Sequence, residues 1–399
     1  MNVQTLKEMM IKYKGLLDEL EELYRQLNDS GYLTPEFEEK MTQVQGEQDR
    51  ILTELLPAFQ AQYPALIKGL WEVDQSLSAF DAYIHDLLLL PDGQILVAGS
   101  QEGIKVLSPP SQDEFGWKVG QIITGFNDYS HTAIHLPDGD VLAGGVSGEL
   151  KVLGPDPGQE GRWIIKQEIE GSDHYVENLL LLPNGDVLVG GIRGEVEIIR
   201  FDEGSNIWKI HQTMEAVSTV SLLLPEERIL IAGYKGEIKI LRHNPDVGDN
   251  WLVQETVDGK QSYITTALLL PEGHVLMGGS DGIIKILGHN AQNKNTWEIL
   301  QEITGFDHYV AGFLLLSPDE VLVGGSFGAM QILSRIPDKE NSWKLGQKIL
   351  GFNQYVSALL LLPNGDVLAG GNKGEMKTIR LKDVTLDQLK GKFPDILKK

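Results

Sequence analysis

The sequence between residues 305 and 333 reads GFDHYVAGFLLLSPDEVLVGGSFGAMQIL. It contains three short apolar runs, which are separated by Ser-Pro-Asp-Glu and by Gly-Gly-Ser-Phe-Gly, two stretches typical of turns. Beyond it, Trp343 opens a fourth run in which apolar and polar residues alternate. This spacing predicts four consecutive short β-strands joined by tight connections.

The same pattern recurs along the central part of the chain. Each copy contains one Trp, and successive Trp residues are 43 to 46 residues apart. A Tyr precedes the first apolar run in six of the seven copies, whereas the fourth copy has Val217 at that position. Seven copies of four strands predict an all-β, seven-bladed β-propeller, because units of this length form blades around a central channel. The tryptophans are Trp71, Trp117, Trp163, Trp208, Trp251, Trp297 and Trp343.

The stretch quoted above resembles a WD40 repeat. Gly305-Phe306 stands where that family has Gly-His, and Ile332-Leu333 lies near where it has Trp-Asp. The resemblance covers residues 71 to about 381 and implies a WD40-like propeller with divergent repeats. Both signature dipeptides are missing from every copy, so the Asp-His-Ser-Trp network of that family is not carried over. We expect the repeated Trp and Tyr rings to pack between blades instead, each with its polar group near the surface.

The order of the runs also predicts how the ring closes. A Trp segment, Trp71 to Leu77, precedes the first complete unit, whereas the last unit ends after residues 377–381 without one. Each end therefore supplies what the other lacks. We expect the N-terminal strand to complete the outer edge of the seventh blade, which also removes an exposed sheet edge.

The first 69 residues follow a helical pattern. Apolar residues at alternating spacings of three and four form a coiled-coil seam over residues 2–28. A turn at residues 28–31 and a helix start at Thr34-Pro35-Glu36 predict a second helix to about residue 56, and hence a helical hairpin. Two helices cannot bury both apolar faces, so the propeller, a second copy of the chain or a foreign helix must cover them. The seam consists of Leu6, Met9, Tyr13, Leu16, Leu20, Leu23 and Leu27.

These patterns predict three parts of the chain. Residues 1–69 form the helical hairpin, residues 70–381 form the propeller, and residues 382–399 form a tail with a short helix that starts near Thr385. The tail helix would pack beside the hairpin or cap the edge of the ring.

Composition restricts the partners. The chain has 34 Lys and Arg against 57 Asp and Glu, a formal charge of -23 that repels nucleic acid and anionic membranes and favours a neutral or basic protein partner. There is no cysteine, which excludes disulfides and thiolate chemistry. No stretch approaches the roughly 18 uninterrupted apolar residues of a membrane span. We therefore expect a cytoplasmic protein without a bound cofactor.

Partner selection is expected on loops that differ between repeats. The loops that enter the first strand of each unit and the tips after each Gly-Gly or Ala-Gly should share one face, which we call the loop face. Tyr234 and Phe327 stand out there, because exposed aromatic residues at loop tips resemble interface anchors, although solvated tips can also vary freely. The candidate residues are Asp128, His174, Arg193, Tyr234, Lys235, Ser262, Asp281, His308, Phe327, Gln354 and Lys373.

Polar residues also begin the inner strands and should line the channel mouth. His85, His131 and Glu177 occupy equivalent positions in the first three units, two residues after the Tyr. Two imidazoles and a carboxylate suit zinc or ferrous iron if the strands bring them together. Adjacent inner strands of a seven-membered ring diverge, however, and a wet channel tolerates polar side chains without any function. The expected metal content is therefore none.

Two functional classes follow from the sequence. The favoured one is a non-catalytic scaffold, whose loop face binds a protein or peptide and whose hairpin mediates assembly, including self-association. The alternative is a metal-dependent propeller enzyme, a lyase or hydrolase, that uses His85, His131 and Glu177. Fold alone does not decide between them, because propellers carry many activities.

Overall fold

The structure is a computed structural model of the 399-residue chain. It describes residues 70–77, 83–100, 103–109, 116–127, 129–169, 175–191, 195–246, 248–260, 263–289, 296–306, 309–337, 339 and 342–382, together with isolated positions between 12 and 50. The chain divides into two units, Trp71–Leu381 and the terminal segments Met1–Leu70 with Lys382–Lys399.

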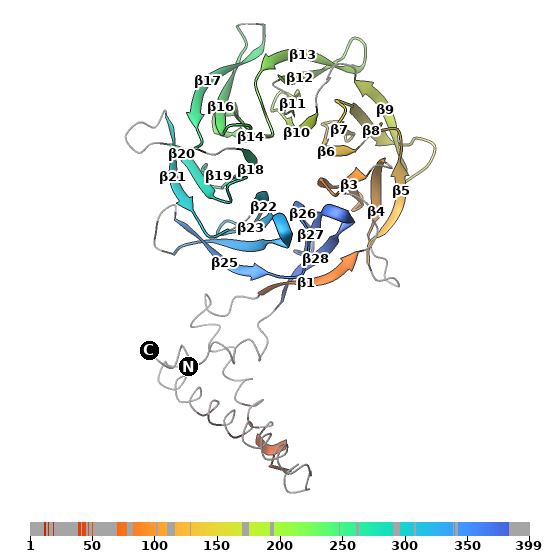
Figure 1. Cartoon of the computed structure of the whole chain (residues 1–399). Coiled ribbons are helices and arrows are strands. Elements are labelled where there is room, and N and C mark those ends of the chain that lie inside the picture. Colours follow the sequence, from red (N-terminus) through yellow and green to blue (C-terminus); the bar gives the residue numbers. More distant parts are fainter. Residues whose placement is uncertain are drawn as a thin grey trace. The chain divides into compact units, whose positions relative to one another are not determined.

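The larger unit consists of seven four-stranded sheets arranged in a ring, as Figure 1 shows. Within each blade the strands follow one another from the channel outward, and each is antiparallel to the next where the pairing is described. Blade one contains β2 (Asp86–Leu89), β3 (Ile95–Ser100), β4 (Gly103–Ser108) and β5 (Lys118–Ile123). Blade two contains β6 (Ser130–His135), β7 (Val141–Gly145), β8 (Leu150–Pro155) and β9 (Trp163–Ile169). Blade three contains β10 (Val176–Leu181), β11 (Val187–Gly191), β12 (Glu195–Asp202) and β13 (Ile207–Glu215).

The second half of the ring repeats this arrangement. Blade four contains β14 (Val220–Leu224), the short 3₁₀ turn η1 (Pro225–Glu227), β15 (Arg228–Ala232), β16 (Glu237–Asn244) and β17 (Asn250–Asp258). Blade five contains β18 (Ile264–Leu269), β19 (Val275–Gly279), β20 (Ile284–His289) and β21 (Trp297–Ile303). Blade six contains β22 (Val310–Ser317), β23 (Glu320–Gly325), η2 (Ser326–Gly328), β24 (Met330–Arg335) and β25 (Trp343–Ile349). The predicted seven-bladed, all-β architecture is therefore confirmed.

Blade seven is built from both ends of the propeller. It contains β26 (Val356–Leu361), β27 (Val367–Gly371), η3 (Asn372–Gly374) and β28 (Met376–Lys382), and β1 (Leu70–Leu77) lies beside β28 at its outer edge. This is the closure that the order of the sequence runs predicts. It leaves blade seven with four strands like the other six blades.

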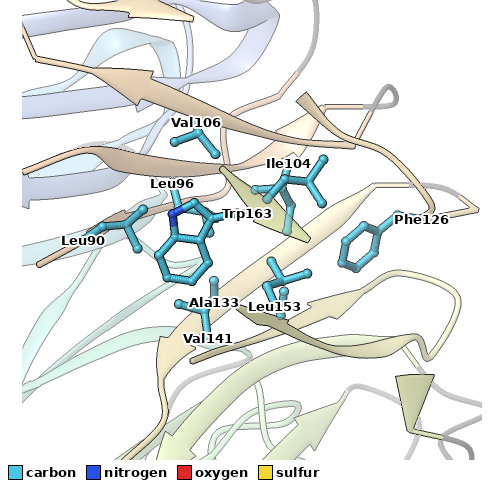
Figure 2. Packing of buried hydrophobic residues seen from close by; sticks show 11 residues of the cluster. Leu90, Leu96, Ile104, Val106, Phe126, Ala133, Val141, Leu153 and Trp163 are labelled. Carbon is cyan, nitrogen blue, oxygen red and sulfur yellow. The ribbon is translucent and has the colours of Figure 1, made fainter. Parts of the chain in front are cut away.

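Trp residues pack at the junctions between blades. Trp163 of blade two is buried against Leu90, Leu96 and Ile104 of blade one, as Figure 2 shows. A ring of about 200 Å² removed from water contributes roughly 5 kcal/mol at 25 cal/mol per Å². The predicted position of the polar group near the surface is wrong for several of these rings, because their indole N–H is buried and has no hydrogen-bond partner among the described residues. These are Trp71, Trp251, Trp297 and Trp343.

A glutamine four residues after five of the seven tryptophans links neighbouring outer strands, a feature that the sequence analysis missed. Gln121 on β5 donates to the carbonyl of Trp163 on β9 and accepts the N–H of the same residue, at 2.6 and 2.9 Å. Gln167, Gln212, Gln301 and Gln347 make the same two hydrogen bonds to Trp208, Trp251, Trp343 and Trp71. In blade four Glu255 stands at this position and accepts the N–H of Trp297 at 3.1 Å. At the six junctions for which the structure describes this side chain, it ties neighbouring blades together at the rim of the ring.

The repeated Gly pairs are explained by close approaches on both sides. A Cβ on Gly371 would lie 1.7 Å from the carbonyl oxygen of Tyr355 in its own blade. A Cβ on Gly370 would lie 2.6 Å from the side chain of Ile84 in blade one. Larger residues at either position would push the inner strands apart, so the pair allows blade seven to pack against blade one.

The aspartates after the Asn-Gly and Asp-Gly turns make ion pairs within their blades. Asp186 receives two hydrogen bonds from Arg200, of 2.8 and 2.6 Å, and Asp366 receives two from Arg380, of 2.9 and 2.6 Å. Asp140 pairs with Lys166 at 2.6 Å. Bidentate arginine pairs of this kind fix the turn and occupy the carboxylate.

Only isolated positions of the N-terminal segment are described, and all of them are helical: 12, 15, 19, 39–40, 42–44, 47 and 50. Lys12 pairs with Glu47 at 2.6 Å, and Lys40 pairs with Glu19 at 3.4 Å. Val44 is buried, with 6% of its surface exposed. The predicted seam of Leu6, Met9, Tyr13, Leu16, Leu20, Leu23 and Leu27, and the tail helix near Thr385, lie outside the described residues. Within the described part of the chain, no helix is long and apolar enough to cross a membrane.

Candidate functional site: the channel mouth and the loop face

The two predicted sets of loops lie against each other. The backbone N–H of Val146, at the β7–β8 tip, donates to the carbonyl of Tyr129, which precedes β6, at 3.0 Å. Blades five, six and seven repeat this hydrogen bond, at 3.0 to 3.1 Å, between the tip residue and the Tyr that precedes the inner strand. The strand tips and the loops that enter the inner strands therefore share one face, as expected.

Three tips of the loop face hold a residue in the left-handed backbone conformation. Lys235, Phe327 and Lys373 have φ angles of 61°, 56° and 56°. Such angles suit Gly or Asn, and a bulky residue adopts them at a cost of about 1 kcal/mol or more. Two of the three, Lys235 and Lys373, are exposed charged residues, as is usual for solvated loop tips. Phe327 is different, because 79% of an aromatic side chain is exposed there.

Phe327 lines a groove at the junction of blades six and seven. The groove has a volume of about 220 Å³, and its other apolar walls include Phe306, Met330, Leu350 and Phe352. Leu350 follows β25 and is 82% exposed. Two large apolar side chains on one groove thus face solvent, which is unusual for a folded surface.

Tyr234 occupies the place left by the missing tyrosine of blade four. Val217 precedes β14 where the other blades have Tyr, and Tyr234, from the tip of the same blade, lies over the ring of Tyr263 with centroids 4.6 Å apart. Val217, Tyr234 and Lys235 line a second hollow, of about 630 Å³. Tyr234 is therefore half-exposed and held by a ring contact.

The remaining predicted loop residues have varied surroundings. Asp281 accepts the N–H of Ile283 at 3.0 Å and lies 3.7 Å from the ammonium of Lys285, so it stabilises its own turn. Gln354 is half-buried and Lys373 is exposed. Five candidates lie outside the described residues: Asp128, His174, Arg193, Ser262 and His308.

Inside the loop face, the channel opens into a cavity of about 390 Å³. The inner strands supply its polar walls, and tyrosines that precede them complete the lining. Its residues are His85, Asp86, His131, Thr132, Glu177, Thr219, Tyr263, Thr265, Tyr309, Ala311, Tyr355 and Ser357. His85, His131 and Glu177, which the sequence places at this mouth, all line it. Tyr309 of blade six and Tyr355 of blade seven have ring centroids 5.5 Å apart, so these rings contact each other across the blade junction and line the cavity as well.

The structure brings His85, His131 and Glu177 together. The two imidazole rings are in contact, with centroids 4.3 Å apart and planes tilted by 32°. The Nε2 atom of His131 lies 3.6 Å from a carboxylate oxygen of Glu177, and its Nδ1 atom lies 3.2 Å from the backbone carbonyl of Glu177. The expectation that adjacent inner strands keep these side chains apart is wrong, because the His85 and His131 rings are in contact and His131 lies within 3.6 Å of Glu177.

Burial keeps the imidazoles neutral. It lowers the pKa of His85 to about 4 and that of His131 to about 3, where the neighbouring His85 adds a smaller lowering. Burial raises the pKa of Glu177 to about 7. Near neutral pH the cluster therefore carries a negative charge only to the extent that Glu177 is ionised.

Asp86 serves the joint between blades one and two. Its carboxylate accepts the N–H of Leu87 at 2.8 Å, the N–H of Ala133 at 2.9 Å and the hydroxyl of Thr132 at 3.3 Å. Burial raises its pKa, and the two backbone hydrogen bonds lower it in part. This satisfied carboxylate links two inner strands and has little capacity left for a ligand.

The cluster does not form a metal site. Among the described residues, no group of three His, Cys, Asp or Glu side chains is placed to hold an ion. The His85 and His131 rings contact each other with planes tilted by 32°, whereas metal ligation requires their nitrogen atoms to converge on one point. The alternative of a metal-dependent enzyme thus gains no support from His85, His131 and Glu177.

No protein-family model and no curated protein sequence matches the chain. Its structure is similar to the crystal structure of the WD40 β-propeller domain of Doa1, with a TM-score of 0.60 and 18% sequence identity over 78% of this chain and 97% of that chain. A likeness at this level of identity shows the fold. It confirms, for the architecture, the resemblance to WD40-like propellers that residues 305–333 carry.

Proposed function

We propose that this chain is a non-catalytic protein-interaction scaffold of the cytoplasm, whose loop face binds a protein or peptide and whose terminal helices mediate assembly. The parts that we assign to these roles are a helical hairpin over residues 1–69, a propeller over residues 70–381 and a helical tail over residues 382–399.

The groove beside Phe327 carries the proposal for the loop face. Exposure of Phe327 and Leu350, at 79% and 82%, leaves apolar surface of both residues in water at one groove. The left-handed backbone at Phe327 adds a conformational cost to that exposure. Aromatic side chains held on such rigid tips are typical anchors of protein interfaces.

The N-terminal ion pairs support the assembly role. Position 12 pairs with position 47, and position 19 pairs with position 40, an order that fits two antiparallel helices. Acidic and basic residues at the edges of a seam set the orientation of helices that pack together. A two-helix unit leaves apolar surface uncovered, and we propose that a second copy of the chain covers it.

The loop face is tested by affinity capture from a lysate of the source organism with three forms of the full chain. We expect the wild type to retain a specific partner, and Phe327→Ala together with Leu350→Ala to weaken its retention at least about tenfold, the effect of losing an interface anchor. Leu252→Ala is the matched control, because Leu252 is an exposed leucine on the outer strand β17. Equal retention by all three forms would contradict the proposed groove.

Assembly is tested by light-scattering mass at several concentrations. We expect the full chain to form a multimer and a chain that starts at Leu70 to be a monomer. Leu16→Asp with Leu20→Asp in the full chain should have the same effect, because two carboxylates in a seam oppose packing. A full chain that is monomeric throughout would contradict self-association.

A further inference from the structure

Glu177 lies in the cavity at the channel mouth, and no Lys or Arg among the described residues pairs with it. Its side chain is largely buried, and among the described residues only the neutral His131 lies within ion-pair distance, at 3.6 Å. Among the described residues that line the cavity, none is Lys or Arg. A buried carboxylate without a compensating positive charge is unfavourable, and the raised pKa of Glu177, about 7, reflects this burial.

The walls around Glu177 are aromatic and uncharged. Tyr263, Tyr309 and Tyr355 line the cavity with it, and Tyr309 and Tyr355 have ring centroids 5.5 Å apart. Burial raises the pKa of all three tyrosines, and the charge of Glu177 adds to the effect in each. The Glu177 carboxylate and the three tyrosines therefore interact electrostatically within one cavity.

We infer that the channel mouth binds a positively charged side chain, an ammonium or guanidinium group, that the protein partner inserts into it. The inference rests on the proposed scaffold function and names the chemistry of its partner. Tyrosine rings attract cations through their faces, and a carboxylate without a cationic partner supplies the opposite charge. A volume of about 390 Å³ is large enough for the end of a long basic side chain.

Anionic and neutral groups fit this site less well. An anion would meet Glu177 and the overall charge of -23, and the described lining of the cavity contains no Lys or Arg to hold it. A neutral group would leave Glu177 desolvated and unpaired. A cation removes that unfavourable state and should lower the pKa of Glu177, so binding releases a proton near neutral pH.

The groups that face Glu177 determine which proton is released. His85 and His131 stay neutral down to about pH 4, and the tyrosines stay protonated at neutral pH. Asp86 is occupied by its own three hydrogen bonds. Glu177, whose pKa is about 7, changes its charge between pH 6 and pH 8, and we assign the released proton to it.

The test uses the full chain and three capped peptides, acetyl-Gly-Gly-X-Gly-Gly-amide, in which X is Arg, Lys or Gln. Binding is measured by ligand-observed NMR, which detects dissociation constants in the millimolar range. We expect the Arg peptide, the Lys peptide or both to bind, the Gln peptide to bind at least about tenfold more weakly, and the affinity for the cation to rise from pH 6 to pH 8. Glu177→Gln should weaken cation binding at least about tenfold and remove its pH dependence.

Glu215→Gln is the matched control. It removes the same charge from the exposed end of β13, in the same blade as Glu177, and should leave binding unchanged. Equal binding of the Gln peptide, equal binding by Glu177→Gln, or no binding of either cationic peptide would overturn the inference. None of these outcomes affects the capture by the Phe327 groove, so failure here and failure of the scaffold proposal are distinguishable.

Discussion

Gln347 and Trp71 lie 276 residues apart in the chain and exchange two hydrogen bonds, of 2.6 and 3.0 Å. Gln347 is on β25 of blade six, and Trp71 is on β1, the strand that completes blade seven. The same reciprocal pair recurs at four other described junctions, so the ring closes with the bond that it uses elsewhere.

Replacing Gln347 should weaken the closed ring. Gln347→Ala leaves the N–H and the carbonyl of Trp71 without their partner, and we expect the free energy of unfolding to fall by about 1–3 kcal/mol. Urea unfolding followed by Trp fluorescence measures the change. Gln254→Ala, at an exposed glutamine of β17, should leave stability within about 0.5 kcal/mol of the wild type. A similar loss in both variants would contradict a special role for Gln347.

Replacing Glu255 tests the same kind of junction by adding a hydrogen bond rather than removing two. It accepts the N–H of Trp297 as the glutamines do, but an ionised carboxylate cannot donate to the Trp297 carbonyl. Glu255→Gln should add that second hydrogen bond and stabilise the protein by about 0.5–1.5 kcal/mol. Thermal unfolding measures this gain in stability, and Glu215→Gln, which removes the same charge elsewhere, is the control. An unchanged or lower melting temperature would refute the role assigned to this position.

Replacing Phe327 should raise the stability of the protein and weaken partner binding. Phe327→Asn suits the left-handed backbone and removes an exposed ring, so we expect the free energy of unfolding to rise by up to about 1 kcal/mol while partner retention falls. Lys373→Asn, at the equivalent tip of blade seven with a φ of 56°, should give a similar gain without loss of binding. Equal loss of partner retention in both variants would show that the tips act through shape rather than through the aromatic side chain.

The Glu177 carboxyl should make stability depend on pH. Its pKa is about 7 in the folded protein and near 4.5 in an unfolded chain, so its favourable contribution is complete below pH 4.5 and is lost as pH rises to about 7. Glu177→Gln lacks this loss. The variant should match the wild type at about pH 4 and exceed its stability by up to about 3 kcal/mol at about pH 8. Urea unfolding at both pH values checks this, and a constant difference would contradict it.

The repeats predict most of the fold because each unit carries its own strands and turns. Seven Trp residues at intervals of 43 to 46 give the number of blades, and the lone Trp71 segment gives the closure. The glutamines stand at a fixed spacing from most of the tryptophans, but their partners are backbone atoms of the next blade. Because almost every residue has a backbone N–H and a carbonyl, no particular residue type in the sequence marks the partner of these hydrogen bonds.

The channel mouth was harder to predict for a related reason. Equivalent positions identified His85, His131 and Glu177, but the distance between them depends on how closely neighbouring inner strands approach. That approach depends on packing such as that of Gly370 against Ile84, which connects blades rather than residues near in sequence. The relative orientation of the His85 and His131 rings decides whether their nitrogen atoms can bind a metal ion. This orientation depends on the same packing between blades.

The place of β1 in blade seven also has a consequence for synthesis. The ribosome delivers β1 first and β28, its neighbour in the sheet, last, more than 300 residues later. At about 5–20 residues per second, roughly 15–60 s separate the two strands. Until β28 emerges, β1 has no neighbouring strand in its sheet, so the ring can close only when the last strand of the propeller is made.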